Sequence, residues 1–310
     1  MSSRTQLRWA SWIVGILAKL LGLLLLTFLL FHLGKVDPAR LKLGPMASEA
    51  SVARERADLG LDRPILVQFA DFFGHAVRGD LGHSFRSERS ALPLAAEKLR
   101  RTFLLVLGGL IPALLLSYGL ALAASVWTSQ RAYILLPARS LAILPSFVIA
   151  VGGLLLLSLA GIRLSSDSGK WAPCLLLALF PTASLTLLLH SATAVEPPPR
   201  PWLLSRSFGF SPIAAFHRAL FSPVSVPWIT AWTTQLSQAV FTAMVLELVL
   251  TIDGGGNLLA NAVQQRDLPV LQAVLLLNGA VFLFLQSGSS WLAGILDPRQ
   301  RNLAPPSNPA

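Results

Sequence analysis

Residues Arg200–Pro227 read RPWLLSRSFGFSPIAAFHRALFSPVSVP and form a polar, basic island between two long apolar runs. The flanking runs are Pro173–Ser191 and Pro227–Ile252. An α-helix needs about 20 mostly apolar residues to cross a bilayer, and both runs meet that requirement. The island is therefore predicted to be a water-exposed loop between two membrane-spanning helices.

The composition indicates a membrane protein. Of the 310 residues, 54% are hydrophobic and only 13% are charged, whereas soluble chains carry about 25% charged residues. The net charge of +10 does not indicate a nucleic-acid partner, because the cations stand at the ends of apolar segments without interleaved aromatics. The single cysteine, Cys174, excludes an intrachain disulfide and a cysteine-based metal site. We expect no metal or other cofactor on this chain.

Six segments are long and apolar enough to span a bilayer, which predicts an all-α polytopic membrane protein with six transmembrane helices. They are Ala10–Leu33, Thr102–Val126, Ser140–Ala160, Pro173–Ser191, Pro227–Ile252 and Val270–Leu296. The first is longer than the apolar region of a secretory signal and lacks a small-residue cleavage site, so we expect it to remain uncleaved. The predicted parts are a tail and first span (1–33), a long extracytoplasmic segment (34–101) with an amphipathic helix, a transmembrane core (102–296) that contains loop 200–227, and a cytoplasmic tail (297–310).

The basic residues predict that both termini are cytoplasmic. With the N-terminus inside, the short inner segments carry nine arginines, from Arg4 to Arg301, and the short outer loops carry three cations, Arg163, Lys170 and Arg266. This bias follows the positive-inside rule, in which loops longer than about 60 residues count little. Six spans then put both chain ends on the same side.

The segment Gly34–Arg101 is predicted to contain an amphipathic helix. Within Pro64–Val77, Ile65, Phe69, Phe72 and Phe73 recur at helical spacing. We expect this helix to lie at the membrane interface, against the outer ends of the spans.

Two charged residues interrupt the apolar spans. Lys19 is expected to snorkel to the inner surface, with a functional intramembrane charge as the alternative. Glu247 in the fifth span has two interpretations of equal weight. It either acts in function, or it is solvated near the outer interface or paired with an arginine such as Arg266. Pro112, Pro145 and Pro181 lie inside predicted spans and mark either hinges or ordinary kinks.

The island itself predicts two short helices. Pro201 suits a helix start, Gly209 permits a left-handed turn that ends the helix, and Ser211 with Pro212 predicts the start of a second helix, Pro212–Phe221. Large apolar side chains are expected to serve as interface anchors, namely Phe208, Phe210, Phe216 and Leu220. The alternative is a surface helix that lies on the membrane without a partner.

Ordered motifs along the chain resemble the inner-membrane permeases of binding-protein-dependent ABC importers of the dipeptide, oligopeptide and nickel type. They are FLLFHLGKVDPA near the first span, ADLGLDRPILVQFADFFGHAVRGDLGHSFRS, LPSFVIA at Leu144–Ala150, VLELVLTIDGGGNLLANAVQQRDLPVLQA and DPRQR at Asp297–Arg301. The resemblance covers nearly the whole length. It implies the type I ABC importer permease fold.

The resemblance implies that the island is the loop whose short coupling helix docks on the ATPase subunit. Gly209 and Pro227 match the family's glycine and following proline. The residues implied in ATPase coupling are Ser205, Arg206, Ser207, Phe208, Gly209, Phe210, Pro212, Phe216 and Pro227. The chain departs from the family pattern in lacking the leading acidic residue, in having Phe208 before the glycine, and in carrying the rigid run Glu196–Pro201. The residues assigned to the translocation path or outer gate are Glu247, Asp253, Arg266 and Asp267.

The chain lacks a phosphate-binding G-x-x-x-x-G-K-[ST] motif. ATP and Mg²⁺ are therefore expected on partner ATPase subunits, and the chain itself is not expected to be an enzyme. The other expected partners are a second homologous permease, an extracytoplasmic solute-binding protein and the lipid bilayer of the bacterial inner membrane. The substrate is left open among dipeptides, oligopeptides, nickel and metal chelates. The alternative functions are a stand-alone secondary transporter and a membrane enzyme or assembly scaffold.

Overall fold

The computed structural model describes residues 3–33, 37–161, 171–193 and 200–296. Their regular structure is helical, apart from one isolated β-bridge between His83 and Ser90. Three stretches named above lie outside the described residues. They are positions 34–36 within the first motif, the start of the proline run Glu196–Pro201, and the tail 297–310 with its DPRQR motif. The chain divides into two compact units, one of residues 1–102 and 250–284 and the other of residues 103–249 and 285–310.

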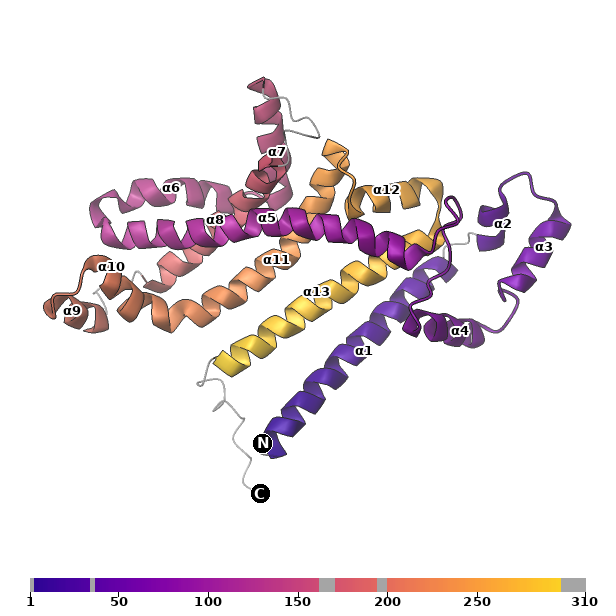
Figure 1. The fold of residues 1–310 in the computed structure, drawn as a ribbon, viewed down its shortest axis with the longest axis horizontal. Helices are drawn as coiled ribbons and strands as arrows, with labels where there is room; N and C mark the ends of the chain where they lie inside the picture. The colour runs from indigo at the N-terminus through magenta and orange to yellow at the C-terminus, as the bar shows by residue number, and fades with distance from the viewer. Residues whose placement is uncertain (1–2, 34–36, 162–170, 194–199, 297–310) are drawn as a thin grey trace. The chain divides into compact units, whose positions relative to one another are not determined.

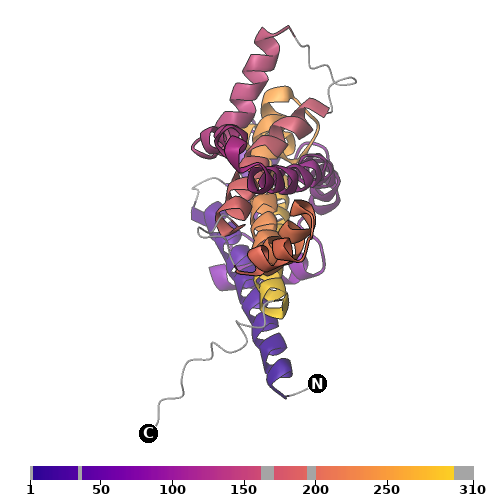
Figure 2. The ribbon, with the colours of Figure 1, turned by 90° about the vertical axis from the view of Figure 1, so that its left-hand side faces the viewer.

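The first unit contains the four helices before residue 91 (Figure 1). It also contains the helix in the loop before the last span. These are α1 (Ser3–Leu33), α2 (Pro38–Leu43), α3 (Glu49–Asp58), α4 (Ile65–Val77) and α12 (Gly255–Gln265). The unit also includes the beginnings of α5 (Ala91–Val126) and of α13 (Leu268–Leu296). α1 and the first part of α13 run side by side in both ribbon views (Figures 1 and 2), and the backbone of Gly279 lies against the side chain of Leu23.

The second unit holds the rest of the helical chain. Its elements are the remainder of α5, η1 (Thr128–Gln130), α6 (Arg131–Ala142), α7 (Ser146–Leu159), α8 (Trp171–Thr193), α9 (Arg200–Ser207), α10 (Pro212–Ala215), the π-helix η2 (Phe216–Phe221) and α11 (Ser222–Leu250). α8 packs against both α6 and α7. The end of α13 also belongs to this unit.

Five described helices are long and apolar enough to cross a membrane, and a sixth span results if α6 and α7 are taken together. This confirms the all-α polytopic class. The third predicted span, Ser140–Ala160, is wrong as a single helix, because α6 ends at Ala142 and α7 begins at Ser146 with a bend of 105° between them. Pro145 lies at this break, and a proline disfavours helical backbone at the residue before it. Pro112 and Pro181, in contrast, lie inside continuous helices.

The helix expected within Pro64–Val77 is confirmed as α4. It packs against the end of α1, where the ring centroids of Phe69 and Phe72 lie 5.3 and 5.8 Å from that of Phe28. A 2.9 Å hydrogen bond joins His32 Nε2 to Gln68 Oε1. Of the four residues at this spacing, Phe69 and Phe72 face the first span, whereas Ile65 and Phe73 are exposed.

Candidate functional site

Gly209 ends helix α9 in the expected left-handed conformation, with φ of 81°. The N–H of Phe210 donates to the carbonyl of Ser205, and the N–H of Gly209 donates to that of Arg206. This is the Schellman pattern, which satisfies carbonyls at a helix end and needs a residue that tolerates positive φ. Nothing lies within 4 Å of the position a Cβ would take on Gly209. The glycine is thus required by backbone conformation rather than by lack of space.

The second helix of the island also begins as expected. The Ser211 hydroxyl accepts a 3.2 Å hydrogen bond from the N–H of Ala214, and Pro212 occupies the first helical position. The helix continues as the π-helix η2 through Phe221 and runs directly into α11. Pro227 was expected at the start of the next span, but it lies inside α11, which begins five residues earlier at Ser222.

The polar side chains of α9 bond to their own loop. The hydroxyls of Ser205 and Ser207 donate 2.8 Å hydrogen bonds to the carbonyls of Pro201 and Leu204. Arg206 Nη1 donates to the carbonyl of Phe210 at 2.7 Å and so braces the turn at Gly209. The loop consequently has an internally fixed shape.

The four predicted apolar anchors fall into two groups. Phe208 is 77% exposed, and Phe210 is half-buried beneath the guanidinium of Arg218, which lies 4.6 Å from its ring centroid. Phe216 and Leu220 are buried within the chain. The prediction that these two side chains are exposed interface anchors is wrong, because one turn of η2 faces the neighbouring helices.

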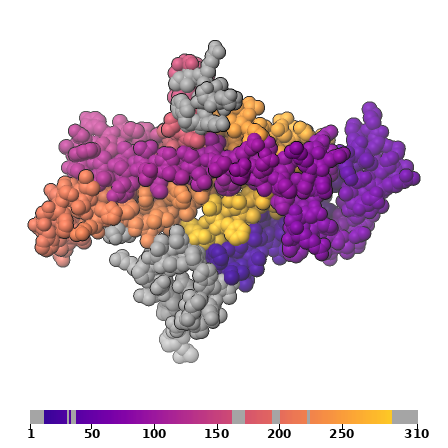
Figure 3. All heavy atoms as spheres, in the orientation of Figure 1, coloured from indigo at the N-terminus to yellow at the C-terminus, as the bar shows by residue number. Residues whose placement is uncertain are grey.

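An aromatic cluster holds the island against the long helices of its unit. The Tyr118 ring on α5 lies 5.9 Å from Phe216 and 5.0 Å from Phe221, and Trp228 on α11 lies 5.5 Å from Phe221. Leu185 and Leu189 of α8 belong to the same core. In Figure 3 the orange atoms of the island lie next to the magenta atoms of α5, in agreement with the ring contacts of Tyr118. A displacement of the island would therefore act directly on α5, α8 and α11, because packed side chains leave little room for independent movement.

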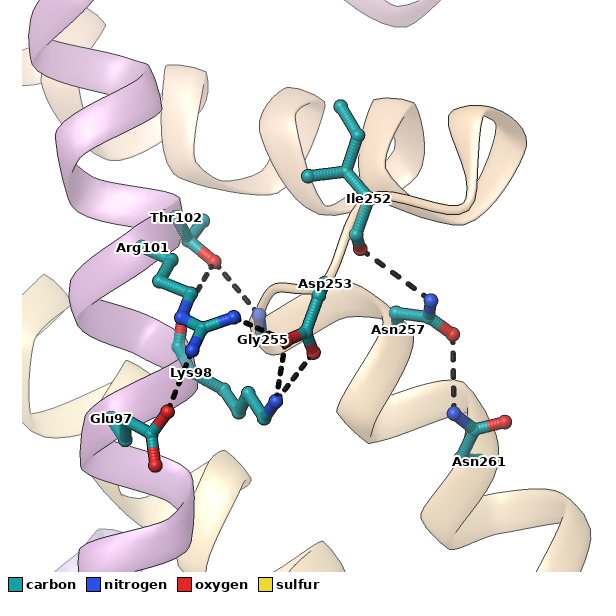
Figure 4. A network of polar contacts seen from close by, with 9 residues as sticks. All are labelled: Glu97, Lys98, Arg101, Thr102, Ile252, Asp253, Gly255, Asn257 and Asn261. Atoms are coloured by element: carbon teal, nitrogen blue, oxygen red, sulfur yellow. Dashed lines mark hydrogen bonds and ion pairs between the residues drawn. The ribbon is translucent and has the colours of Figure 1, made fainter. Parts of the chain in front are cut away.

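A second candidate site lies in the first unit, around Asp253 (Figure 4). Lys98 Nζ donates to both carboxylate oxygens of Asp253, at 2.5 and 2.7 Å, and Arg101 pairs with the same carboxylate. Glu97 accepts from Arg101 at 2.8 Å. The hydrogen bond from Lys98 is the main cause that lowers the pKa of Asp253 below its ordinary value of 3.8, with the positive charges of Lys98 and Arg101 acting in the same direction.

The triple glycine after Asp253 lies close to α5. The N–H of Gly255 donates a 2.9 Å hydrogen bond to Thr102 Oγ1. A Cβ on Gly255 would lie 2.6 Å from Leu99 Cδ2, so a larger residue would require the Leu99 side chain to shift. The loop Asp253–Gly256 is thus held to the beginning of α5 by charge and by backbone contact.

Asp267 takes part in a separate, buried contact. It is 4% exposed, and it accepts hydrogen bonds from the Ser84 hydroxyl at 2.5 Å and from the N–H of Phe85 at 3.1 Å. Arg266 is exposed and has a left-handed backbone at the end of α12, with φ of 55°. Asp253 and Asp267 were both assigned to the translocation path or outer gate, and in the structure each has its own partners.

Sequence reasoning missed those partners as candidates. Ser84 stands within the quoted motif GDLGHS, which was the available signal. Lys98 and Arg101 precede the second span. Their role as partners of Asp253 becomes visible only in the folded chain, where the three side chains meet.

Glu247 is 1% exposed. This burial excludes the interpretation in which bulk water solvates the carboxylate. Lys19 on α1 is exposed. Among the described residues, no group of three or more histidine, cysteine, aspartate or glutamate side chains could hold a metal ion.

The comparisons with known proteins agree with these features. Residues 140–302 match the family described as binding-protein-dependent transport system inner membrane component. Residues 8–105 match the N-terminal region of such membrane components. The chain belongs to this family, and it is an inner-membrane permease of a peptide-type ABC importer.

Several relatives carry the name glutathione transport system permease protein GsiC. The chain is 28% identical to the protein from Salmonella choleraesuis, 27% to that from Pectobacterium atrosepticum and 26% to that from Escherichia coli. Each similarity extends over 296 residues, 93% of this chain and 97% of the relative. The family consists of multi-pass transport subunits that are not enzymes and that work with ATPase and binding-protein partners.

Proposed function

We propose that this chain forms one half of a translocation path for short peptides, with a second homologous permease as the other half. An extracytoplasmic binding protein delivers the substrate, and partner ATPase subunits that bind ATP and Mg²⁺ drive transport. Glutathione-sized peptides are the preferred substrate class, before nickel chelates, because the relatives described above are named for glutathione transport.

The observation that carries this proposal is the shape of the loop 200–227. Its Schellman turn at Gly209 holds Phe208 exposed beside a buried aromatic cluster that reaches α5 and α11. An exposed aromatic on a rigid hairpin is suited to a partner's pocket, and the buried rings behind it are suited to pass on a displacement. We assign this loop to ATPase contact, on the cytoplasmic side with both termini, in agreement with the arginine bias.

The segment 34–101 and the loop Asp253–Pro269 lie on the extracytoplasmic side in this proposal and face the binding protein. The cluster of Asp253, Lys98 and Arg101 supports a position of this loop in water outside the bilayer, because charges there avoid the cost of burial in lipid.

Reconstitution of the complete complex tests the proposal. The chain is co-expressed with its second permease, ATPase and binding protein and placed in proteoliposomes. Uptake of labelled glutathione, a dipeptide, a longer peptide and nickel–histidine is then measured with and without ATP. We expect an ATPase subunit to co-purify and ATP-dependent uptake of the short peptides. Uptake driven by an ion gradient without an ATPase would instead identify a secondary transporter, and purification without any ATPase would contradict the proposal.

A further inference from the structure

The polar side chains of α11 gather at one place in the membrane span. α11 contains the least apolar of the five long spans. Near its middle, Gln235, Gln238 and Thr242 line a small cavity together with Ser146 at the start of α7. Polar groups at this depth are costly, and they are found where they bond to one another or line a path.

Only part of this polar set is satisfied within the chain. The hydroxyls of Ser146 and Thr242 share a 2.8 Å hydrogen bond. Gln235 Oε1 is buried and has no hydrogen-bond partner in the described chain. A buried polar atom without a partner costs free energy, so its presence at a cavity wall indicates that a ligand or a water molecule binds there.

The opposite wall adds a backbone acceptor. Pro181 and Leu177 of α8 both line the cavity. Pro181 lies inside the helix and has no N–H to donate, so the carbonyl of Leu177, four residues earlier, loses its helical partner. This carbonyl is therefore available to an N–H group from outside the helix.

We propose that Gln235, Gln238 and Thr242 on α11, with the Leu177 carbonyl on α8, form a contact site for the backbone amides of the transported peptide. This inference rests on the proposed function, because these residues would belong to the proposed translocation path. A glutamine side chain offers both a donor and an acceptor, which is the complement of a peptide group. The lining, all of it within the described helices, carries no charged side chain, so the site selects the peptide backbone rather than a particular side chain or a metal ion.

The cavity has a volume of about 10 Å³, about the space that one water molecule requires. A peptide enters only when α8 and α11 move apart. Gln238 lines the cavity and is also exposed on the surface of the chain. The site therefore opens to the surface at Gln238.

Cysteine labelling tests the site directly, because Cys174 is the chain's single cysteine. In the assembled complex, a Cys174→Ala background receives Gln238→Cys, or Phe241→Cys as the control outside the cavity lining. A membrane-impermeant thiol reagent is applied during ATP turnover. We expect labelling of Gln238→Cys that excess glutathione slows several-fold, and labelling of Phe241→Cys that glutathione does not change. If wild-type uptake is intact, two results would overturn the inference. One is absence of labelling at position 238, and the other is a labelling rate there that glutathione does not change.

Transport kinetics provide a second measurement. Gln238→Leu is expected to raise the KM for peptide uptake about fivefold, the effect of one lost hydrogen bond. Gln286→Leu, a matched change on α13 outside the cavity lining, is expected to leave KM unchanged. Equal effects of both variants, or dissociation of the complex by Gln238→Leu alone, would overturn the inference. Failure of the wild-type complex to take up peptides would instead overturn the proposed function itself.

Discussion

The Ser84 hydroxyl donates a 2.5 Å hydrogen bond to the buried carboxylate of Asp267, 183 residues further along the chain. The Phe85 N–H donates to the other carboxylate oxygen. This contact joins the segment before α5 to Asp267, the residue directly before α13. Ser84 also accepts from the N–H groups of Arg86 and Ser87, so the hydroxyl organises its own turn as well as the long-range contact.

Asp267→Ala is expected to lower the free energy of unfolding by about 3 kcal/mol, because hydrogen bonds to charged groups contribute about 1.5–3 kcal/mol each and the change leaves two donors unsatisfied. Ser84→Ala is expected to cost about half as much. Unfolding by a denaturing detergent measures both. The exposed neighbour Ser87 provides the control Ser87→Ala, which should remain within about 0.5 kcal/mol of wild type. An Asp267→Ala variant as stable as this control would show that the contact does not contribute to stability.

The ion pairs of Asp253 predict a dependence on pH. Its pKa is lowered in the folded chain, mainly by the hydrogen bond from Lys98. The ionised carboxylate therefore stabilises the fold fully above the ordinary pKa of 3.8, and this stabilisation is lost as pH falls through the lower folded value. Because the carboxylate is largely exposed, the effect at neutral pH is expected to be below about 1 kcal/mol and to shrink with added salt.

The difference in Tm between wild type and Asp253→Asn, measured from pH 7 to pH 3 at low and high salt, checks this expectation. The difference in Tm between the two proteins should shrink as the pH falls toward 3. Asp58→Asn, an exposed acid on α3, serves as the control and should show little salt dependence. A gap that persists unchanged at pH 3 would mean that Asp253 acts by some means other than its charge.

The sequence predicted the apolar spans well, because a length of about 20 apolar residues is a local property. It also located α4 and the two helices around Gly209, since caps and glycine turns depend on neighbouring residues. It did not predict the 105° bend between α6 and α7, because a proline inside an apolar run permits either a kink or a break, and tertiary packing decides between them.

The candidate sites were only partly predictable for a related reason. Gly209 and Asp253 were identified from motifs, but the inward side of η2 was not. A π-helix adds a residue to each turn, so helical spacing does not show that Phe216 is buried while Phe208 is exposed. Lys98 and Ser84 were missed because their partners are more than 150 residues away.

The left-handed backbone at Gly209 predicts a graded response to substitution. Gly209→Val is expected to uncouple ATP hydrolysis from peptide uptake while the complex still assembles, because a β-branched residue at positive φ distorts the turn at a cost of at least about 1–2 kcal/mol. Gly209→Asn should retain most coupling, because asparagine tolerates this conformation. The ratio of peptide taken up to ATP hydrolysed measures the effect. Full coupling in Gly209→Val would argue against a role of this turn in transmission.

Phe208 and Phe216 lie eight residues apart on the same loop, yet one is 77% exposed and the other fully buried. Phe216→Ala is expected to destabilise the chain by about 3–5 kcal/mol, because it leaves a cavity beside Tyr118. Phe208→Ala should leave the unfolding free energy within about 0.5 kcal/mol of wild type. It should nevertheless weaken binding of the ATPase subunit by about 2 kcal/mol, or roughly 30-fold, as expected for an aromatic interface anchor.

Detergent unfolding of the isolated chain and titration with the purified ATPase separate the two effects. Ile213→Ala, which truncates another exposed apolar residue of the loop, shows whether any loss of surface apolar area has the same consequence. If Phe208→Ala binds the ATPase as tightly as wild type while Ile213→Ala does not, the contact surface lies on α10 rather than at the turn. If neither variant loses affinity, the loop contacts the membrane surface instead of a partner, which is the alternative that the sequence left open.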